Sequence, residues 1–106
     1  MARRRDMSDA DLREMARYFQ ALRDVLRLRI LWTLTEHGEM TVTELAQALH
    51  VSQPLISFHL RPLRLLALVQ VRRAGREVYC SVNVAEIQRR QAEFTDMLSL
   101  GAAGSE

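Results

Sequence analysis

The feature that most limits how this chain can fold is a very short gap, residues 50–52, between two helical segments. The first segment begins at a Thr-Val-Thr-Glu motif, where the side chains of Thr41 and Glu44 can each accept a backbone N–H from the other residue. The second begins after Ser52, a residue type that caps helices, and its helical pattern extends to Leu66. Two short helices joined by so tight a turn form a helix-turn-helix unit, in which the second helix is placed to enter a groove.

Apolar periodicity predicts further elements on both sides of this unit. Residues 9–23, 25–36 and 84–98 carry apolar side chains at the helical spacing of three and four. After Ala67 the apolar residues alternate instead, which predicts two strands around a basic tip at 72–76. We therefore expect a mainly α fold with a small β-hairpin wing, a winged helix-turn-helix with the element order ααααββα.

Composition narrows the class of protein further. A chain of 106 residues has room for one compact domain, and its 48% hydrophobic and 26% charged residues exclude a disordered chain. No apolar run approaches the roughly 20 residues that cross a bilayer. The single cysteine, Cys80, excludes an intramolecular disulfide framework and fits a reducing compartment. We expect a cytoplasmic protein with no membrane partner.

Charge is distributed unevenly along the chain. All 15 basic residues are arginines, and residues 50–83 hold five of them against one acid, a net charge of +4. Residues 1–49 are neutral overall and residues 84–106 carry a net charge of −2. A basic excess confined to one segment is the distribution that phosphate binding would require, although a solvated surface can also show it.

The run VSQPLISFHLRPL at 51–63 resembles the recognition-helix signature of the ArsR/SmtB family of bacterial repressors, with its serine cap followed by Ser-x-His-Leu-x-x-Leu. The likeness continues upstream in LRDVLRLRILWTL and TVTELAQAL and downstream in LVQVRRAGREVYCSV, so it covers about residues 12–98. It implies a homodimeric transcriptional regulator, a repressor, that binds double-stranded DNA at an inverted-repeat operator. The domains would then be a flexible basic arm at 1–8, a DNA-binding and dimerisation domain at 9–98 and a flexible tail at 99–106.

The resemblance implies that the first and last helices pair across the two-fold axis. The residues themselves agree, because both helices carry apolar stripes that a monomer of this size would struggle to cover. The alternative is that one chain covers both stripes by itself. The predicted dimer contacts are Leu12, Met15, Phe19, Ile87, Phe94 and Met97.

The second helix of the helix-turn-helix has two faces. Its apolar positions, Ile56, Leu60 and Leu63, belong to the core, and the opposite face is free to read DNA. The predicted contacts to base edges are Gln53, Pro54, Ser57 and Phe58, and the predicted phosphate ligands are Arg61 and Arg64 with Arg72, Arg73 and Arg76 of the wing. An ordinary solvated surface is the alternative for both groups.

Three residues of this region invite separate expectations. Pro62 removes the hydrogen bond to the Phe58 carbonyl, which predicts a bend or an irregularity in the helix. Ala67 stands where the family usually has a glycine, which predicts a less tightly turned corner. We expect His59 to pack and hydrogen-bond as a structural residue rather than to bind a metal.

The family's usual metal sites are absent. Thr41-Val42-Thr43 replaces a Cys-Val-Cys motif, and Val84, Glu86, Met97 and Leu100 replace the ligands of the last helix. Nitrogen and oxygen ligands remain near the second helix, at Glu36, His37 and Glu39, and they would suit nickel or zinc. Control by a sensor protein, or the lack of any effector, are the alternatives. We expect Cys80 to be a core residue rather than a redox sensor.

Two other classes of function are conceivable for a chain of this size. A protein-interaction module that keeps the winged-helix scaffold is one, since a fold does not fix a function. An enzyme is excluded by the sequence, which has no Ser/His/Asp or Cys/His set, no glycine-rich phosphate loop and no paired carboxylates in a plausible pocket.

Overall fold

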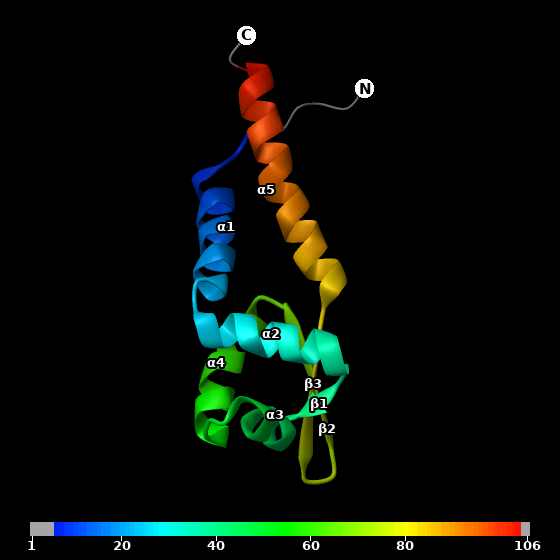
Figure 1. The fold of residues 1–106 in the computed structure, drawn as a ribbon. Helices are drawn as coiled ribbons and strands as arrows, with labels where there is room; N and C mark the ends of the chain where they lie inside the picture. Colours follow the sequence, from blue (N-terminus) through cyan, green and yellow to red (C-terminus); the bar gives the residue numbers. More distant parts are fainter. Residues whose placement is uncertain (1–5, 105–106) are drawn as a thin grey trace.

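The computed structural model describes residues 6–104, and in this part of the chain it shows five helices and one three-stranded antiparallel sheet. The elements in chain order are α1 (Asp9–Leu22), α2 (Val25–His37), β1 (Met40–Thr41), α3 (Val42–Leu49), α4 (Gln53–Leu65), β2 (Val69–Ala74), β3 (Glu77–Val82) and α5 (Val84–Gly104). Helices α3 and α4 form the helix-turn-helix, and β2 and β3 form the wing beside it (Figure 1). The predicted winged helix-turn-helix fold is confirmed.

Helices α3 and α4 begin at Thr41 and Ser52, the side chains that the sequence predicted as caps, and capping side chains start the other three helices as well. At α3, the Thr41 hydroxyl accepts the Glu44 N–H at 3.0 Å and the Glu44 carboxylate accepts the Thr41 N–H at 2.8 Å. An equivalent capping box starts α1, and single caps start the other three helices; the residues are Ser8 with Asp11, Asp24, Ser52 and Asn83. These contacts span three residues, which is why local sequence was sufficient to predict them.

The sheet has the strand order β1-β3-β2. Strand β1 was not predicted, because two residues are too short to show an alternating pattern; its Met40 pairs with Cys80 of β3. The wing turns at Gly75, which has a φ of +61°, and Ala74 pairs with Glu77 across the turn. A positive φ at the first central residue of a two-residue hairpin loop favours glycine there.

The core lies where α2, α3 and α4 meet the sheet. Ile56, Leu60 and Leu63 of α4 are buried, as predicted. The first helix gives Tyr18 and Ala21 to the core, whereas Leu12 and Phe19 of its apolar stripe are exposed in the protomer. Helix α1 therefore has one apolar face inside the protomer and a second one outside it.

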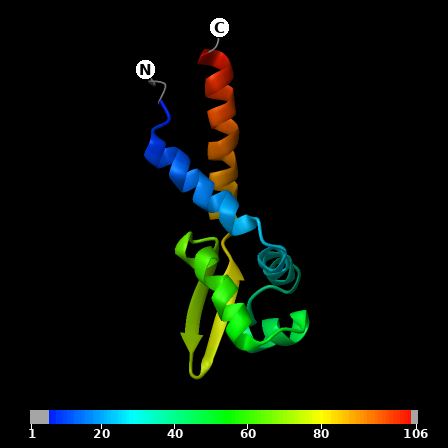
Figure 2. The ribbon, with the colours of Figure 1, turned by 90° about the vertical axis from the view of Figure 1, so that its left-hand side faces the viewer.

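The protomer is elongated, with extents of 55 × 26 × 23 Å and a radius of gyration of 16.7 Å. A compact chain of this length would have a radius of about 13 Å. The excess comes from α1 and α5, which extend away from the helix-turn-helix and the wing (Figure 2). Within one protomer these two helices touch through the rings of Phe19 and Phe94, whose centroids are 4.9 Å apart.

Helix α5 is longer than predicted. It continues past Leu98 to Gly104, so most of the expected flexible tail at 99–106 is helical. The predicted basic arm falls mainly on residues 1–5, which lie outside the described residues. None of the described helices, α5 included, is long and apolar enough to span a membrane.

Arg90 of α5 is a buried cation that joins three helices. Its Nε donates to Glu86 at 2.9 Å, its Nη1 to Glu14 of α1 at 3.4 Å, and its Nη2 to the Leu66 carbonyl at the end of α4 at 3.1 Å. The Arg90 side chain is only 10% exposed, and its guanidinium lies over the ring of Tyr18. Arg90 thus ties α1 and α5 to the end of the recognition helix.

Helix α4 runs without a break from Gln53 to Leu65 with Pro62 inside it, so the proline does not end the helix. Pro62 has no N–H to donate to the Phe58 carbonyl, and the bend expected there stays a prediction. The looser corner expected at Ala67 is wrong. The Leu68 N–H donates to the Leu63 carbonyl at 2.8 Å and the Ala67 N–H to the Arg64 carbonyl at 3.0 Å, which is the full Schellman pattern. This turn strains the backbone of Ala67, because its φ of +59° is unfavourable for a residue that has a Cβ.

Replacing Ala67 with glycine is expected to raise the free energy of unfolding by about 0.5–1 kcal/mol, because glycine adopts a positive φ without the Cβ clash. Urea titrations at one fixed protein concentration measure it. The matched control is Ala48→Gly, at an exposed position with ordinary helical geometry in α3, where a glycine should destabilise instead. Equal destabilisation by both substitutions would contradict the strain assigned to Ala67.

Candidate nucleic-acid interface

A groove of about 650 Å³ lies between α4 and the wing. It brings together six of the nine residues that the sequence predicted for DNA contact, namely Gln53, Ser57, Arg61, Arg64, Arg73 and Arg76. The one acidic residue among those that line it is Glu77, so the groove is strongly basic. Two polar and four cationic side chains in one groove give both hydrogen-bonding groups for base edges and charges for phosphates.

Helical spacing places the α4 residues in this groove. Gln53, Ser57 and Arg61 follow one another four residues apart, so they lie along one side of the helix. The other two predicted base readers lie apart from them. Pro54 and Phe58 are exposed but do not line the groove, and the Phe58 ring, 67% exposed, meets the His59 ring edge-on at 5.2 Å.

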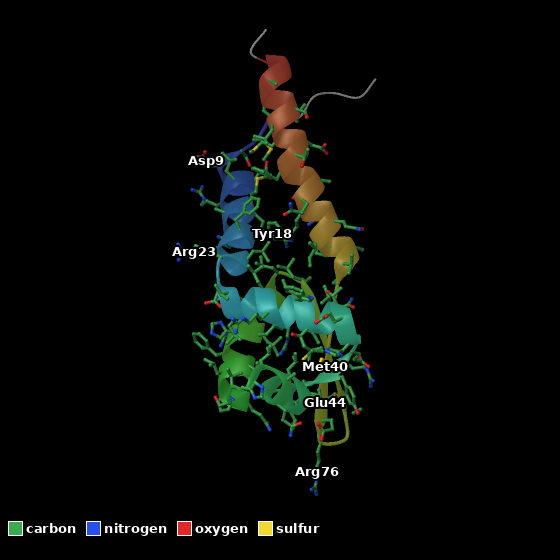
Figure 3. The ribbon with its side chains drawn as sticks, viewed as in Figure 1. Asp9, Tyr18, Arg23, Met40, Glu44 and Arg76 are labelled. Carbon is green, nitrogen blue, oxygen red and sulfur yellow. The ribbon has the colours of Figure 1, made fainter. Side chains whose placement is uncertain are left out.

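Alternation along β2 separates the wing arginines. Arg73 pairs with Val78 and lines the groove, and Arg76 lies at the tip of the hairpin (Figure 3). Arg72 pairs with Tyr79 and so lies on the other face of the sheet, because successive residues of a strand point in opposite directions. Arg73 and Arg76 line the groove and Arg72 does not, so a DNA contact by Arg72 stays a prediction that the groove does not support.

Arg72 already has an acidic partner. Its Nε and Nη2 donate to the two carboxylate oxygens of Glu39 at 2.9 and 2.7 Å, and its guanidinium stacks on the Tyr79 ring at 4.3 Å. The hydrogen bonds from Arg72 lower the pKa of Glu39, and those to Glu39 raise the pKa of Arg72. Arg72 therefore holds the wing against the loop before β1 rather than facing the groove.

His59 has the structural role that the sequence predicted. Its Nδ1 accepts a hydrogen bond from the Arg27 Nε at 3.2 Å, and it lies 3.7 Å from the Asp24 carboxylate. His59 thereby fixes α4 against the start of α2.

The predicted metal ligands do not come together within one protomer. Among residues 6–104 no group of three or more His, Cys, Asp and Glu side chains is placed to hold a metal ion. The Glu39 carboxylate accepts hydrogen bonds from Arg72, and Glu36 and His37 are exposed at the end of α2. Glu36, His37 and Glu39 therefore do not form a metal site among the described residues of one protomer, and their role as metal ligands stays a prediction.

Cys80 is a core residue, as expected. It is fully buried in β3, and burial raises the pKa of its thiol to about 11. A thiol with so high a pKa is protonated at neutral pH and is a poor nucleophile.

Sequence reasoning missed Thr43, which lines the groove from the first turn of α3. The signal was its place two residues after the capping residue Thr41, where a helix-turn-helix presents the N-terminus of its first helix to the DNA backbone. Thr43 adds a hydroxyl to the basic groove.

Known proteins resemble this chain in sequence and in fold. A family model described as bacterial regulatory protein, arsR family, matches residues 24–71. The chain is 39% identical over 92 residues to the transcriptional repressor SmtB homolog of Synechocystis sp., covering 87% of this chain and 69% of the relative. The cadmium resistance transcriptional regulatory protein CadC homolog of Staphylococcus aureus is 29% identical over 86 residues, covering 81% and 71%.

Solved structures that superimpose on this chain also belong to DNA-binding or transcriptional regulators. The homodimeric winged helix-turn-helix DNA-binding domain of Mb0332 from Mycobacterium bovis superimposes with a TM-score of 0.71 at 30% identity, covering 93% of this chain and 91% of that one. An ArsR-like transcriptional regulator from Rhodococcus sp. superimposes with a TM-score of 0.75 at 29% identity, covering 85% and 84%.

Proposed function

Because this chain belongs to the ArsR family of bacterial transcriptional regulators, we propose that it binds an inverted-repeat operator as a homodimer and represses transcription. The observation that carries the proposal is the basic groove between α4 and the wing, which gathers Gln53, Ser57, Arg61, Arg64, Arg73 and Arg76. In a two-fold symmetric dimer the two grooves would address half-sites about one helical turn, roughly 34 Å, apart.

The groove residues divide into two roles. Gln53 and Ser57 lie near the start of α4, where helix-turn-helix proteins contact base edges, and a glutamine can pair with adenine through two hydrogen bonds. Arg61, Arg64, Arg73 and Arg76 bind phosphates on either side. Pro54 and Phe58, which are exposed on α4 outside the groove, are suited to contact thymine methyl groups.

The experiment compares the DNA affinity of variants that lack an arginine of the groove with that of a variant that lacks an arginine outside it. Fluorescence anisotropy with DNA from the protein's own promoter region should show that Arg61→Ala and Arg76→Ala each weaken binding about tenfold and reduce the log-log salt slope by about 0.9. Arg72→Ala is the matched control, since Arg72 belongs to the same wing but is held by Glu39. It should leave the salt slope unchanged.

Two outcomes would count against this assignment. A loss with Arg72→Ala equal to that with Arg76→Ala would show that the Glu39 contact opens on DNA. If the parent protein binds DNA weakly, with an affinity that depends neither on salt concentration nor on DNA sequence, the protein-interaction module is favoured instead.

A response to nickel or zinc stays a prediction, and the structure sharpens its test. A metal held by Glu36, His37 and Glu39 must displace Arg72 from the Glu39 carboxylate. Titration calorimetry with each metal should then show tighter binding by Arg72→Ala and none by His37→Ala. Binding that neither substitution changes, or no binding at all, would exclude these residues as the sensor.

A further inference from the structure

A second cavity, of about 440 Å³, lies away from the DNA groove, where the end of α1, the start of α2 and the end of α4 meet. Its polar wall contains Arg17, Arg23 and Arg27, and its apolar wall contains Ala21, Leu65 and Leu66. Volumes of 300–1,000 Å³ with a mostly apolar lining and a few placed polar groups are typical of small-molecule sites. Figure 3 shows Arg23 at the corner between α1 and α2.

The cavity has unused positive charge. The Arg23 guanidinium has no acidic partner in the part of the chain that the structure describes. Arg27 donates from Nε to His59 and from Nη1 to the Ala21 carbonyl, which leaves the donors of Nη2 available. The carboxylate that lines the cavity, Asp24, caps α2 by accepting the Arg27 N–H at 3.1 Å. Arg17 is paired with Glu14 and Arg27 is attracted to Asp24, so Arg23 carries the charge that no acidic residue among 6–104 balances, and Arg27 contributes its available Nη2 donors.

The position of the cavity suits regulation. On α1 the cavity is lined by Arg17, Gln20 and Ala21. Arg17 and Ala21 lie roughly opposite Leu12 and Phe19, the predicted dimer contacts, and Gln20 lies to one side. A dimer formed through Leu12 and Phe19 would therefore leave the Arg17 and Ala21 side of the cavity uncovered. Leu65 lines both this cavity and the DNA groove, and its side chain is 76% exposed.

We propose that this cavity binds an amphipathic organic anion, a carboxylate on a short apolar chain, as an effector of DNA binding. The carboxylate accepts hydrogen bonds from the guanidiniums of Arg23 and Arg27, which suit its planar geometry. The chain lies against Ala21, Leu65 and Leu66. The effector role, though not the binding site, rests on the proposed DNA-binding function.

Leu65 provides the link between the two sites. A ligand chain packed against Leu65 changes the position of the Leu65 side chain. Because Leu65 also lines the DNA groove, the groove changes with it. The ligand must then change DNA affinity, and DNA must change the ligand's affinity by the same factor, because the coupling of two binding equilibria is reciprocal.

Titration calorimetry with the full chain and octanoate tests the site. Octanoate should bind saturably at one site per chain, whereas acetate, which lacks the apolar chain, and octanol, which lacks the charge, should bind at least tenfold more weakly. Arg23→Glu should weaken octanoate binding at least tenfold. The matched control is Arg29→Glu, which makes the same charge reversal at an exposed position of α2 outside the cavity and should leave binding unchanged.

The result that overturns the site is an absence of saturable octanoate binding, or an equal loss with Arg23→Glu and Arg29→Glu. The effector role has its own readout, the affinity for promoter DNA with and without saturating octanoate. A protein that binds DNA but whose affinity octanoate leaves unchanged would refute the effector role alone. A protein that binds octanoate but no DNA would refute the proposed function and leave the site standing.

Discussion

Replacing Arg90 with methionine is expected to lower the free energy of unfolding by about 2–4 kcal/mol, the cost of breaking a buried ion pair and leaving a buried carbonyl without its donor. Methionine keeps the unbranched stem of the arginine but loses the donors to Glu86, Glu14 and the Leu66 carbonyl. Urea denaturation at a fixed protein concentration measures the loss, because a dimer's stability depends on concentration.

The matched control for this loss is Arg17→Met. Arg17 also pairs with Glu14, at 2.8 Å, but both side chains of that pair are at least half exposed. Exposed ion pairs contribute about 0–1 kcal/mol, so the control should change stability little. Similar losses in the two variants would mean that Arg90 contributes only surface charge and does not tie α1 and α5 to the end of α4.

The parts of the fold that were predicted from sequence depend on near neighbours. The helix starts at Thr41 and Ser52 are set by hydrogen bonds that span three residues. The core face of α4, at Ile56, Leu60 and Leu63, follows from helical periodicity alone. For the same reason the groove side of α4 was largely predicted before the structure placed the wing beside it.

The parts that were missed depend on contacts between distant segments. Arg90 looked like one more charge on the last helix, and only the fold brings it to Glu14 and to the end of α4. Tyr18 is buried and its hydroxyl donates to Gln91 at 2.6 Å, a pairing that spans most of the chain. No pattern within one helix could have indicated either contact.

The separation of Arg72 from Arg73 could have been predicted. Arg72 and Arg73 are consecutive residues of a strand, so alternation places them on opposite faces of the sheet. The expected basic tip at 72–76 includes the last residues of a strand, because β2 runs to Ala74. Only the partner of Arg72 required the structure, since Glu39 lies in the segment that leads into the unpredicted strand β1.

The uncovered side of α1 leads to the prediction with the largest effect on DNA binding. Tyr18 and Ala21 face the protomer core, whereas Leu12 on the outer side of the same helix is 42% exposed. Leu98, on the projecting part of α5, is also exposed. Helices with a second apolar face and an elongated protomer are what a symmetric dimer through α1 and α5 requires, because each protomer then covers the other's surface.

Replacing Leu12 with aspartate is therefore expected to dissociate the dimer without unfolding the protomer, since an exposed side chain contributes little to the core. DNA affinity should fall about 10²–10⁴-fold, because two linked half-site contacts become independent ones. Analytical ultracentrifugation and circular dichroism would report mass and helix content, and anisotropy would report DNA binding. Leu28→Asp is the matched control, at a leucine of α2 that is 47% exposed. If it dissociates the dimer as completely as Leu12→Asp does, the dimer surface is not confined to α1 and α5.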